Sequence, residues 1–188
     1  MVAKPIIYLI RHGEKPPKKD GKDVDGLSSE GVKRADYLPQ VFGKQSQYSI
    51  GYILAEHPEK VHLDGSRDRP YETVLPLSKA LDLPIHKHIS RDDVGDAAKK
   101  ALAYQGPGNV LICWEHGELA KIAQALGVTG FTGRPDCKVV YPDDRFDLIW
   151  TVSEPYTEIS QVASEDVPGL DGGAVKDWCV CEEKKSSA

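Results

Sequence analysis

The chain has 188 residues, of which 24 are Lys or Arg and 29 are Asp or Glu, so its formal net charge is −5. A chain of this length forms one domain by default and buries enough surface to fold without disulfides or a structural metal. The acidic balance argues against nucleic acid as a partner, and no apolar run reaches the roughly 18 residues that would suggest a membrane span.

The predicted elements alternate between short apolar strands and helical stretches. In chain order we expect a strand at residues 6–10, a helix at 27–42, a strand at 52–55, a helix at 70–81, a strand at 84–86, a helix at 92–104, a strand at 110–114, a helix at 117–126 and a strand at 146–152, which we place at the edge of the sheet. This alternation predicts an α/β fold, a three-layer sandwich whose mostly parallel central sheet has helices on both faces.

Capping residues and prolines mark the predicted helices. Ser28 or Ser29 is expected to cap the first helix, and Pro39 is expected to kink or end it. Pro70 suits the first turn of the second helix, whereas Pro76 predicts a kink inside it.

We expect a single domain over residues 1–165 and a loosely packed C-terminal tail over 166–188, because the tail is rich in Gly, Ser and charge. The first apolar run is too short for the core of a signal peptide, so the predicted location is the cytoplasm and the four cysteines are expected to be reduced. Cys179 and Cys181 have one spacer residue and no second pair, so no metal is predicted there.

Two predicted strands run directly into a histidine. The strand at 6–10 leads into Arg11-His12-Gly13-Glu14, and the strand at 110–114 leads into Glu115-His116-Gly117-Glu118. In a mostly parallel sheet, ligands bind at the carboxyl ends of the strands. Both imidazoles are therefore expected at the same rim of the sheet.

The residue types at this rim suit phosphoryl transfer. The guanidinium groups of Arg11 and Arg69 match phosphate oxygens bidentately, and an uncharged His12 is a nucleophile at neutral pH. His116 can donate a hydrogen bond to the transferring group. The set fits a small phosphomonoester and requires neither a metal nor a cofactor.

Other phosphatase chemistries lack their residues in this chain. A cysteine-based phosphatase needs an Arg six residues after its nucleophile, and neither Cys113 nor Cys137 has one. The sequence also has no Gly-rich phosphate loop followed by Lys and Ser or Thr, which argues against hydrolysis of nucleoside triphosphates by such a loop.

Four segments occur in an order that is typical of one family. They are Tyr8-Leu-Ile-Arg-His-Gly-Glu14, Leu27-Ser-Ser-Glu-Gly31, Arg69-Pro-Tyr-Glu-Thr73 and Trp114-Glu-His-Gly117. Together they resemble the motifs of the histidine phosphatase superfamily, also called phosphoglycerate-mutase-like proteins, over about residues 5–152. The resemblance implies that His12 becomes phosphorylated and that Arg11, Arg69 and His116 bind the phosphoryl group.

The chain departs from the family pattern after the second arginine. Pro70 stands where the family often has Ala. Arg67 is close enough to compete with Arg69 for the role of second arginine. We favour Arg69, because Thr73 follows it by four residues, as in the family.

The resemblance leaves the general acid open among three residues. Many family members have a Glu about two dozen residues after the second Arg that protonates the leaving alkoxide. Here that window holds Asp92 and Asp93, which would equally suit the start of a helix. Another branch of the family points to Glu118, which we also assign to substrate binding. Our first choice of acid is Asp93, and we expect Glu115 to point elsewhere.

The sequence thus predicts a metal-independent phosphatase that hydrolyses a phosphomonoester through a phosphohistidine on His12. The alternative is a non-catalytic phosphate-recognition or scaffold protein of the same fold. A mutase is less favoured, because 188 residues leave little room for segments that shelter the phosphoenzyme from water.

Lysines 15, 18, 19 and 22 follow the first histidine and either solvate a loop or steer an anionic substrate. We predict neither the substrate nor the oligomeric state.

Overall fold

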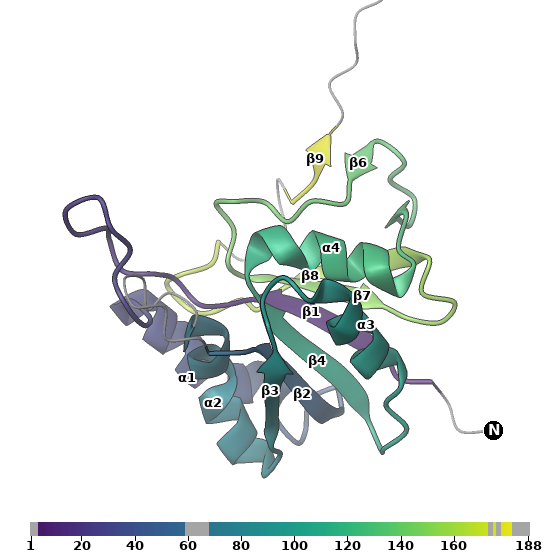
Figure 1. Ribbon diagram of the computed structural model, residues 1–188, viewed down its shortest axis with the longest axis horizontal. Helices are drawn as coiled ribbons and strands as arrows, with labels where there is room; N and C mark the ends of the chain where they lie inside the picture. Colours follow the sequence, from purple (N-terminus) through teal and green to yellow (C-terminus); the bar gives the residue numbers. More distant parts are fainter. Residues whose placement is uncertain (1–3, 59–67, 173–174, 176–177, 182–188) are drawn as a thin grey trace, which may run out of the picture.

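The computed structural model describes residues 4–58, 68–172, 175 and 178–181 (Figure 1). Within this part of the chain the helices are α1 (Ser29–Phe42), α2 (Arg69–Leu81), α3 (Val94–Leu102) and α4 (His116–Leu126). The strands are β1 (Ile7–Arg11), β2 (Ile50–Glu56), β3 (Ile85–Ile89), β4 (Asn109–Trp114), β5 (Gly130–Phe131), β6 (Cys137–Lys138), β7 (Leu148–Val152), β8 (Glu158–Ser164) and β9 (Val180–Cys181).

The described strands form a seven-stranded central sheet in the order β3-β2-β4-β1-β7-β8-β5 and a separate pair, β6 and β9. Strands β1, β2, β3 and β4 are parallel, and β5 is parallel to β8. Only β7 within the central sheet of this region runs antiparallel to its neighbours. The prediction of a mostly parallel sheet is therefore confirmed.

The position predicted for the last strand is wrong. Strand β7 lies between β1 and β8 rather than at the edge, and its Leu148, Ile149 and Trp150 are fully buried. The strand that lies outside it, β8, was not predicted, because its sequence EISQVAS carries polar residues on its exposed face and reads as a loop.

Helices cover both faces of the sheet, as expected for a three-layer sandwich (Figure 1). Successive side chains of a strand point to opposite faces, so Leu9 packs in the cluster that includes α3 and α4, whereas Ile10 packs in the cluster that includes α1 and α2. The central layer thereby holds the carboxyl ends of four parallel strands at one rim.

A capping residue and a proline mark the starts of α1 and α2, as the sequence predicts, whereas Pro39 does not mark the end of α1. Ser28 caps α1, because its hydroxyl accepts a hydrogen bond from the Gly31 amide at 3.1 Å. Pro39 does not end α1, which continues to Phe42. Pro70 lies in the first turn of α2, as predicted, and Pro76 lies inside this helix. None of the described helices is long and apolar enough to cross a membrane.

The described part of the expected tail makes specific contacts. Val167 is fully buried. The carboxylate of Asp171 accepts hydrogen bonds from the Val167 amide at 2.7 Å and from the buried Arg34 guanidinium at 2.8 and 3.1 Å. Glu165, just before this segment, is buried and accepts from Arg34 at 2.9 Å. Residues 165–171 are thus fastened to α1 by a buried guanidinium.

The expectation of reduced thiols is wrong for two of the cysteines, because Cys137 and Cys179 form a disulfide across a sequence separation of 42. The fold brings these residues together beside the pairing of β6 with β9, which no local pattern reveals. Cys113 is a free, buried thiol. A disulfide is at odds with the reducing location that the sequence suggested.

We expect reduction of this disulfide to lower the free energy of unfolding by about 3–4 kcal/mol. The bond closes a loop in the unfolded chain and lowers its entropy, and reduction removes this restriction. Thermal melts with and without dithiothreitol measure the effect, and a Cys137→Ser variant serves as the control that should not respond. Identical melting of the wild type in both conditions would contradict the disulfide.

A second expectation concerns Glu165. Burial raises the pKa of this carboxyl to about 8, although the Arg34 guanidinium acts to lower it. The folded state therefore keeps a proton that the unfolded chain loses above its ordinary pKa of 4.5, so this group destabilises the fold as the pH rises towards 8. Glu165→Gln should melt close to the wild type at pH 4.5 and above it at pH 8.5. A difference that is the same at both pH values would contradict the assignment.

Candidate active site

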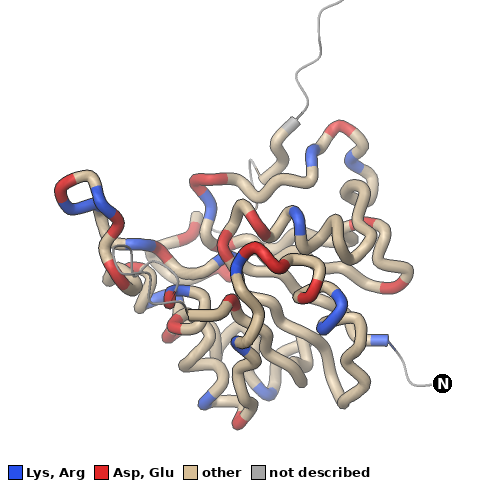
Figure 2. The backbone as a smooth tube through the Cα atoms, in the orientation of Figure 1, with Lys and Arg blue, Asp and Glu red and all other residues tan. Residues whose placement is uncertain are grey.

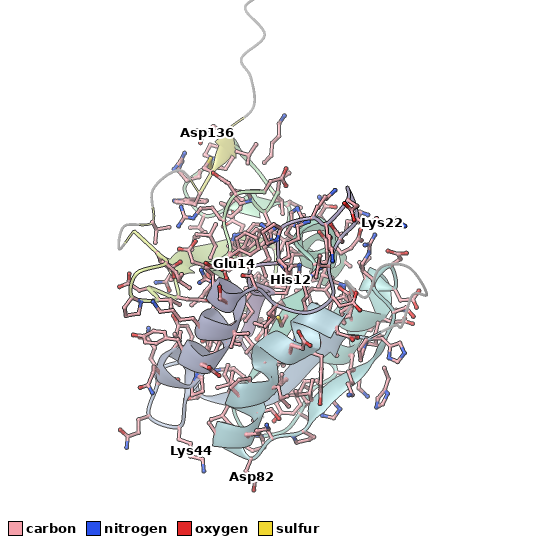
Figure 3. The ribbon with its side chains drawn as sticks, turned by 90° about the vertical axis from the view of Figure 1, so that its left-hand side faces the viewer. His12, Glu14, Lys22, Lys44, Asp82 and Asp136 are labelled. Carbon is pink, nitrogen blue, oxygen red and sulfur yellow. A yellow bond between two sulfur atoms is a disulfide. The ribbon has the colours of Figure 1, made fainter. Side chains whose placement is uncertain are left out.

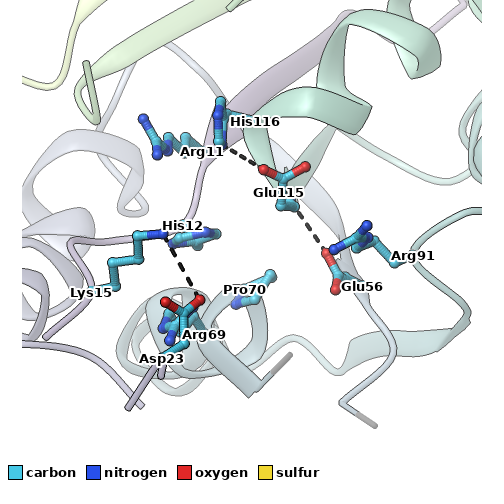
Figure 4. Close-up of a pocket in the computed structure, with 10 residues that line it drawn as sticks. All are labelled: Arg11, His12, Lys15, Asp23, Glu56, Arg69, Pro70, Arg91, Glu115 and His116. Carbon is cyan, nitrogen blue, oxygen red and sulfur yellow. Dashed lines mark hydrogen bonds and ion pairs between the residues drawn. The ribbon is translucent and has the colours of Figure 1, made fainter. Parts of the chain in front are cut away.

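A polar pocket of about 210 Å³ lies at the rim where β1, β2, β3 and β4 end (Figure 4). Its lining residues are Arg11, His12, Lys15, Asp23, Glu56, Arg69, Pro70, Arg91, Glu115 and His116. The structure thus brings together four of the residues that the sequence singled out, namely Arg11, His12, Arg69 and His116. Arg67, the competitor of Arg69, lies outside the described residues.

His12 lies near the centre of this pocket, with Arg11 and His116 on one side and Arg69 on the other (Figure 4). Its Nδ1 is 2.7 Å from the carbonyl oxygen of Gly13. A carbonyl oxygen can only accept, so Nδ1 carries the proton and Nε2 keeps its lone pair. Burial lowers the pKa of His12 to about 3, and the charges of Arg11 and Arg69 act in the same direction. At neutral pH the ring is uncharged.

The backbone that follows His12 is held from α2. The Gly13 amide donates to Thr73 Oγ1 at 2.8 Å, and this hydroxyl donates to the Arg69 carbonyl at 2.7 Å. On the other side the backbone approaches α1 closely, because a Cβ added to Gly13 would lie 2.9 Å from the Gly31 carbonyl oxygen. A glycine is required at position 13 for this contact, and the approach fixes the carbonyl that orients His12.

Arg11 is oriented by backbone carbonyls. Its Nη1 donates to the carbonyls of Asp143 and Arg145 at 2.6 and 2.7 Å, and its guanidinium lies 3.8 Å from the ring centre of Phe146. Its buried Nε has no hydrogen-bond partner among the described residues. Burial lowers the pKa of Arg11, but a guanidinium remains charged at neutral pH. The carbonyl oxygens are uncharged, so they orient the guanidinium without forming an ion pair with it. Its other N–H groups can bind an anion.

Arg69 is held in the same way from the opposite side of the pocket. Its Nε donates to the Gly26 carbonyl at 2.9 Å, and its Nη2 donates to the Val24 carbonyl at 2.7 Å. Burial lowers the pKa of this guanidinium as well. Two charged guanidiniums therefore flank a neutral imidazole, which is an arrangement that can bind a phosphoryl group and attack it.

His116 lies between two carboxylates. Its Nδ1 is 2.5 Å from Glu115 Oε1, and its Nε2 is 3.0 Å from the exposed Asp143 Oδ1. Burial acts to raise the pKa of Glu115, but hydrogen bonds from His116 and from the Gly117 and Glu118 amides outweigh it and lower this pKa to about 2. Glu115 is therefore ionised at neutral pH, and its Oε1 lies beside the His116 ring.

The three candidates for the general acid lie outside the pocket lining. Asp93 stands at the N-terminal cap of α3, and Asp92 is exposed and pairs with Arg91 at 3.2 Å. Glu118 lies one turn into α4, where its carboxylate accepts from Lys121 at 2.7 Å. Asp92 and Glu118 thus pair with neighbouring basic side chains, and none of the three residues lines the pocket.

Sequence reasoning missed four charged lining residues, Asp23, Glu56, Arg91 and Glu115, and the expectation that Glu115 points elsewhere is wrong. Glu56 is the last residue of β2, Arg91 follows β3 by two residues, and Glu115 follows β4 directly. The argument that placed both histidines at the carboxyl ends of strands applies equally to these positions, so the signal was present in the sequence.

The loop that carries the four lysines projects from the body of the molecule, and both signs of charge occur along it (Figures 1 and 2). Lys19 and Lys22 pair their backbones at its tip. Lys15 and Lys18 lie 3.9 and 4.0 Å from Asp23, and Lys15 also lines the pocket. One lysine of the four thus reaches the candidate site, while Asp23 offsets part of the positive charge.

One group of possible metal ligands occurs in the described part of the chain, at Asp136, Cys137 and Cys179. Its two sulfur atoms are bonded to each other, and a disulfide does not supply the thiolates that bind a metal. The pocket at the rim, which the guanidiniums of Arg11, Arg69 and Arg91 line, suits an anion.

Neither a family model nor a curated protein matches the chain. Solved structures do match it. The protein histidine phosphatase SixA complexed with tungstate is 15% identical with a TM-score of 0.57, over 85% of this chain and 97% of that one. A candidate phosphohistidine phosphatase SixA from Agrobacterium tumefaciens is 11% identical with a TM-score of 0.59, over 86% and 98%. A further candidate SixA from Nakamurella multipartitia is 12% identical with a TM-score of 0.50, over 85% and 95%.

These matches span nearly the whole of each solved chain, so the chain has the fold of the histidine phosphatase superfamily. The pocket described above lies at the carboxyl ends of the parallel strands of this fold.

We expect Arg69→Ala to weaken the binding of inorganic phosphate roughly 10- to 100-fold, since hydrogen bonds to a charged group contribute about 1.5–3 kcal/mol. Isothermal titration of the purified protein measures the dissociation constant. Lys44→Ala removes a positive charge at the lower edge of the molecule in Figure 3, away from His12, and should leave the constant unchanged. Equal binding by Arg69→Ala and the wild type would contradict the site.

Proposed function

We propose that this protein is a metal-independent phosphatase in which His12 is the nucleophile. One observation carries the proposal: His12 is buried, uncharged and protonated on Nδ1, and it lies between two guanidiniums that backbone carbonyls orient. Phosphoryl transfer depends mainly on positioning and on stabilisation of charge, and both are present before a substrate arrives. The shared fold with phosphohistidine phosphatases supports the same activity.

In the first step Nε2 of His12 attacks phosphorus, and the bond from phosphorus to the leaving group breaks. The leaving group takes the bonding electrons, while Arg11 and Arg69 neutralise the charge on the phosphoryl oxygens. In the second step water attacks the phosphohistidine, the P–N bond breaks, and its electron pair returns to Nε2. Inorganic phosphate leaves, and His12 regains its starting form.

The leaving group also needs a proton. Asp93 was our first choice from the sequence, but it lies at the start of α3, outside the pocket lining. We assign the proton to His116, which lines the pocket and whose ring nitrogens lie 2.5 and 3.0 Å from Glu115 and Asp143. His116 gives this proton to the leaving group and recovers one from the attacking water in the second step.

The substrate is proposed to be a small phosphomonoester, and a specific observation favours phosphohistidine as a second candidate. The pocket holds about 210 Å³, which suits a phosphoryl group better than a large leaving group, so the leaving group lies at the surface. A phosphorylated side chain of a protein meets this condition, and SixA is named as a protein histidine phosphatase. Comparing a phosphohistidine peptide with a phosphoserine peptide distinguishes the two substrates.

We expect His12→Ala to lower hydrolysis of an aryl phosphate by at least about 1,000-fold, because removal of a covalent nucleophile leaves only binding and charge stabilisation. Acid-quenched labelling should detect a phosphohistidine in the wild type and none in the variant. His88→Ala, which changes an exposed histidine on β3, is the matched control.

Full activity of His12→Ala would overturn the proposed mechanism. Phosphate binding without a covalent species in the wild type would favour the phosphate-recognition protein that the sequence left as an alternative. Transfer of the phosphoryl group to a second hydroxyl in preference to water would favour a mutase.

A further inference from the structure

The buried guanidinium of Arg34 contacts three acidic side chains beside the candidate site. Its Nε and Nη2 donate to Glu14 at 2.6–3.1 Å. Its Nη1 donates to Glu165 at 2.9 Å, and Nη1 and Nη2 both donate to Asp171, at 3.1 and 2.8 Å. All three nitrogens are therefore in use, and the side chain is almost fully buried. A guanidinium is the only side chain that offers five donors in one rigid plane.

Glu14 connects this cluster to His12, and Figure 3 shows the two residues near each other in the middle of the view. The Glu14 carbonyl accepts from the Ser28 amide at 2.9 Å. A Cβ added to Gly31 would lie 2.4 Å from the Glu14 carbonyl oxygen, so the backbone here rests directly on the first turn of α1. Arg34 holds the side chain of the same residue. Glu14 is thus fixed to α1 through both its backbone and its carboxylate.

The peptide group that Glu14 shares with Gly13 includes the carbonyl that accepts the Nδ1 proton of His12. Movement of Glu14 away from α1 rotates this carbonyl and lengthens the hydrogen bond. The proton of a neutral imidazole is then free to occupy Nε2, and an Nε2 that carries a proton has no lone pair with which to attack phosphorus.

We propose that Arg34 is a positioning residue for His12. Its hydrogen bonds to Glu14 fix the adjacent Gly13 carbonyl, and this carbonyl keeps the His12 proton on Nδ1. The catalytic consequence rests on the proposed role of His12 as the nucleophile. Arg34 also contacts Glu165 and Asp171. These contacts hold residues 165–171 against α1 and do not position the Gly13 carbonyl.

Glu14→Gln tests this inference with the smallest change, because it keeps the shape of the side chain and removes its charge. Asp171→Asn is the matched control: it makes the same chemical change on the same guanidinium without touching Glu14. Nitrogen-15 NMR of the His12 ring reports the tautomer directly, and rapid-quench kinetics with an aryl phosphate report the rate of His12 phosphorylation.

In Glu14→Gln we expect a mixture of His12 tautomers and a roughly tenfold slower phosphorylation with little change in KM, in line with the size of effects from residues that orient a functional histidine. Asp171→Asn should lower the melting temperature but keep the Nδ1–H tautomer and a phosphorylation rate within about twofold of the wild type. Arg34→Lys should reproduce the kinetic loss of Glu14→Gln, and the double variant should lose little more, because both changes break one interaction.

An unchanged His12 tautomer in Glu14→Gln would overturn the inference, even if Arg34→Lys fails to fold. Equal kinetic losses in Glu14→Gln and Asp171→Asn would also overturn it, since they would show a general effect of stability. The NMR measurement does not depend on turnover. A wild type that keeps the tautomer and forms no phosphohistidine would therefore refute the proposed function while leaving the positioning role intact.

Discussion

The hydrogen bond from His12 Nδ1 to the Gly13 carbonyl is the interaction on which the candidate site depends. It places the proton on one ring nitrogen and leaves the lone pair of the other free, and burial keeps the ring uncharged. The bond requires a carbonyl that cannot rotate. Thr73 on α2 holds the Gly13 amide, and Gly31 at the start of α1 allows the backbone to rest against that helix. Two helices on one face of the sheet thus determine the chemistry of one imidazole.

The charges around this imidazole follow from how each side chain is held. Arg11 and Arg69 are oriented by carbonyl oxygens, which align a guanidinium without cancelling its charge. A carboxylate partner would have offset that charge and weakened the attraction for an anion. His116, in contrast, lies against the carboxylates of Glu115 and Asp143. A chain with a net charge of −5 therefore presents a local site for a small anion.

The C-terminal segment contributes to this arrangement through α1 and through the loop before β7. Arg34 draws Glu165 and Asp171 against α1 while it holds Glu14. The disulfide of Cys137 with Cys179 attaches the end of the described chain to the loop that leads towards Asp143. The carbonyl of Asp143 accepts a hydrogen bond from Arg11. Described residues of the expected tail thus contact α1 and the loop before β7.

The sequence by itself determined the layered α/β fold, the strands that lead into His12 and His116, and the pairing of these residues with Arg11 and Arg69. The fold and the two histidines follow from local patterns, namely apolar runs, capping residues and residues at strand ends, whereas the choice of Arg69 follows from the resemblance of residues 69–73 to a family motif. Only the tertiary structure decided that β7 lies inside the sheet, that Glu115 lines the pocket while Asp93 lies outside it, and that Cys137 meets Cys179. It also decided that Arg34 joins residues more than 100 positions apart. These outcomes depend on which side chains packing brings into contact, and no local pattern encodes that choice.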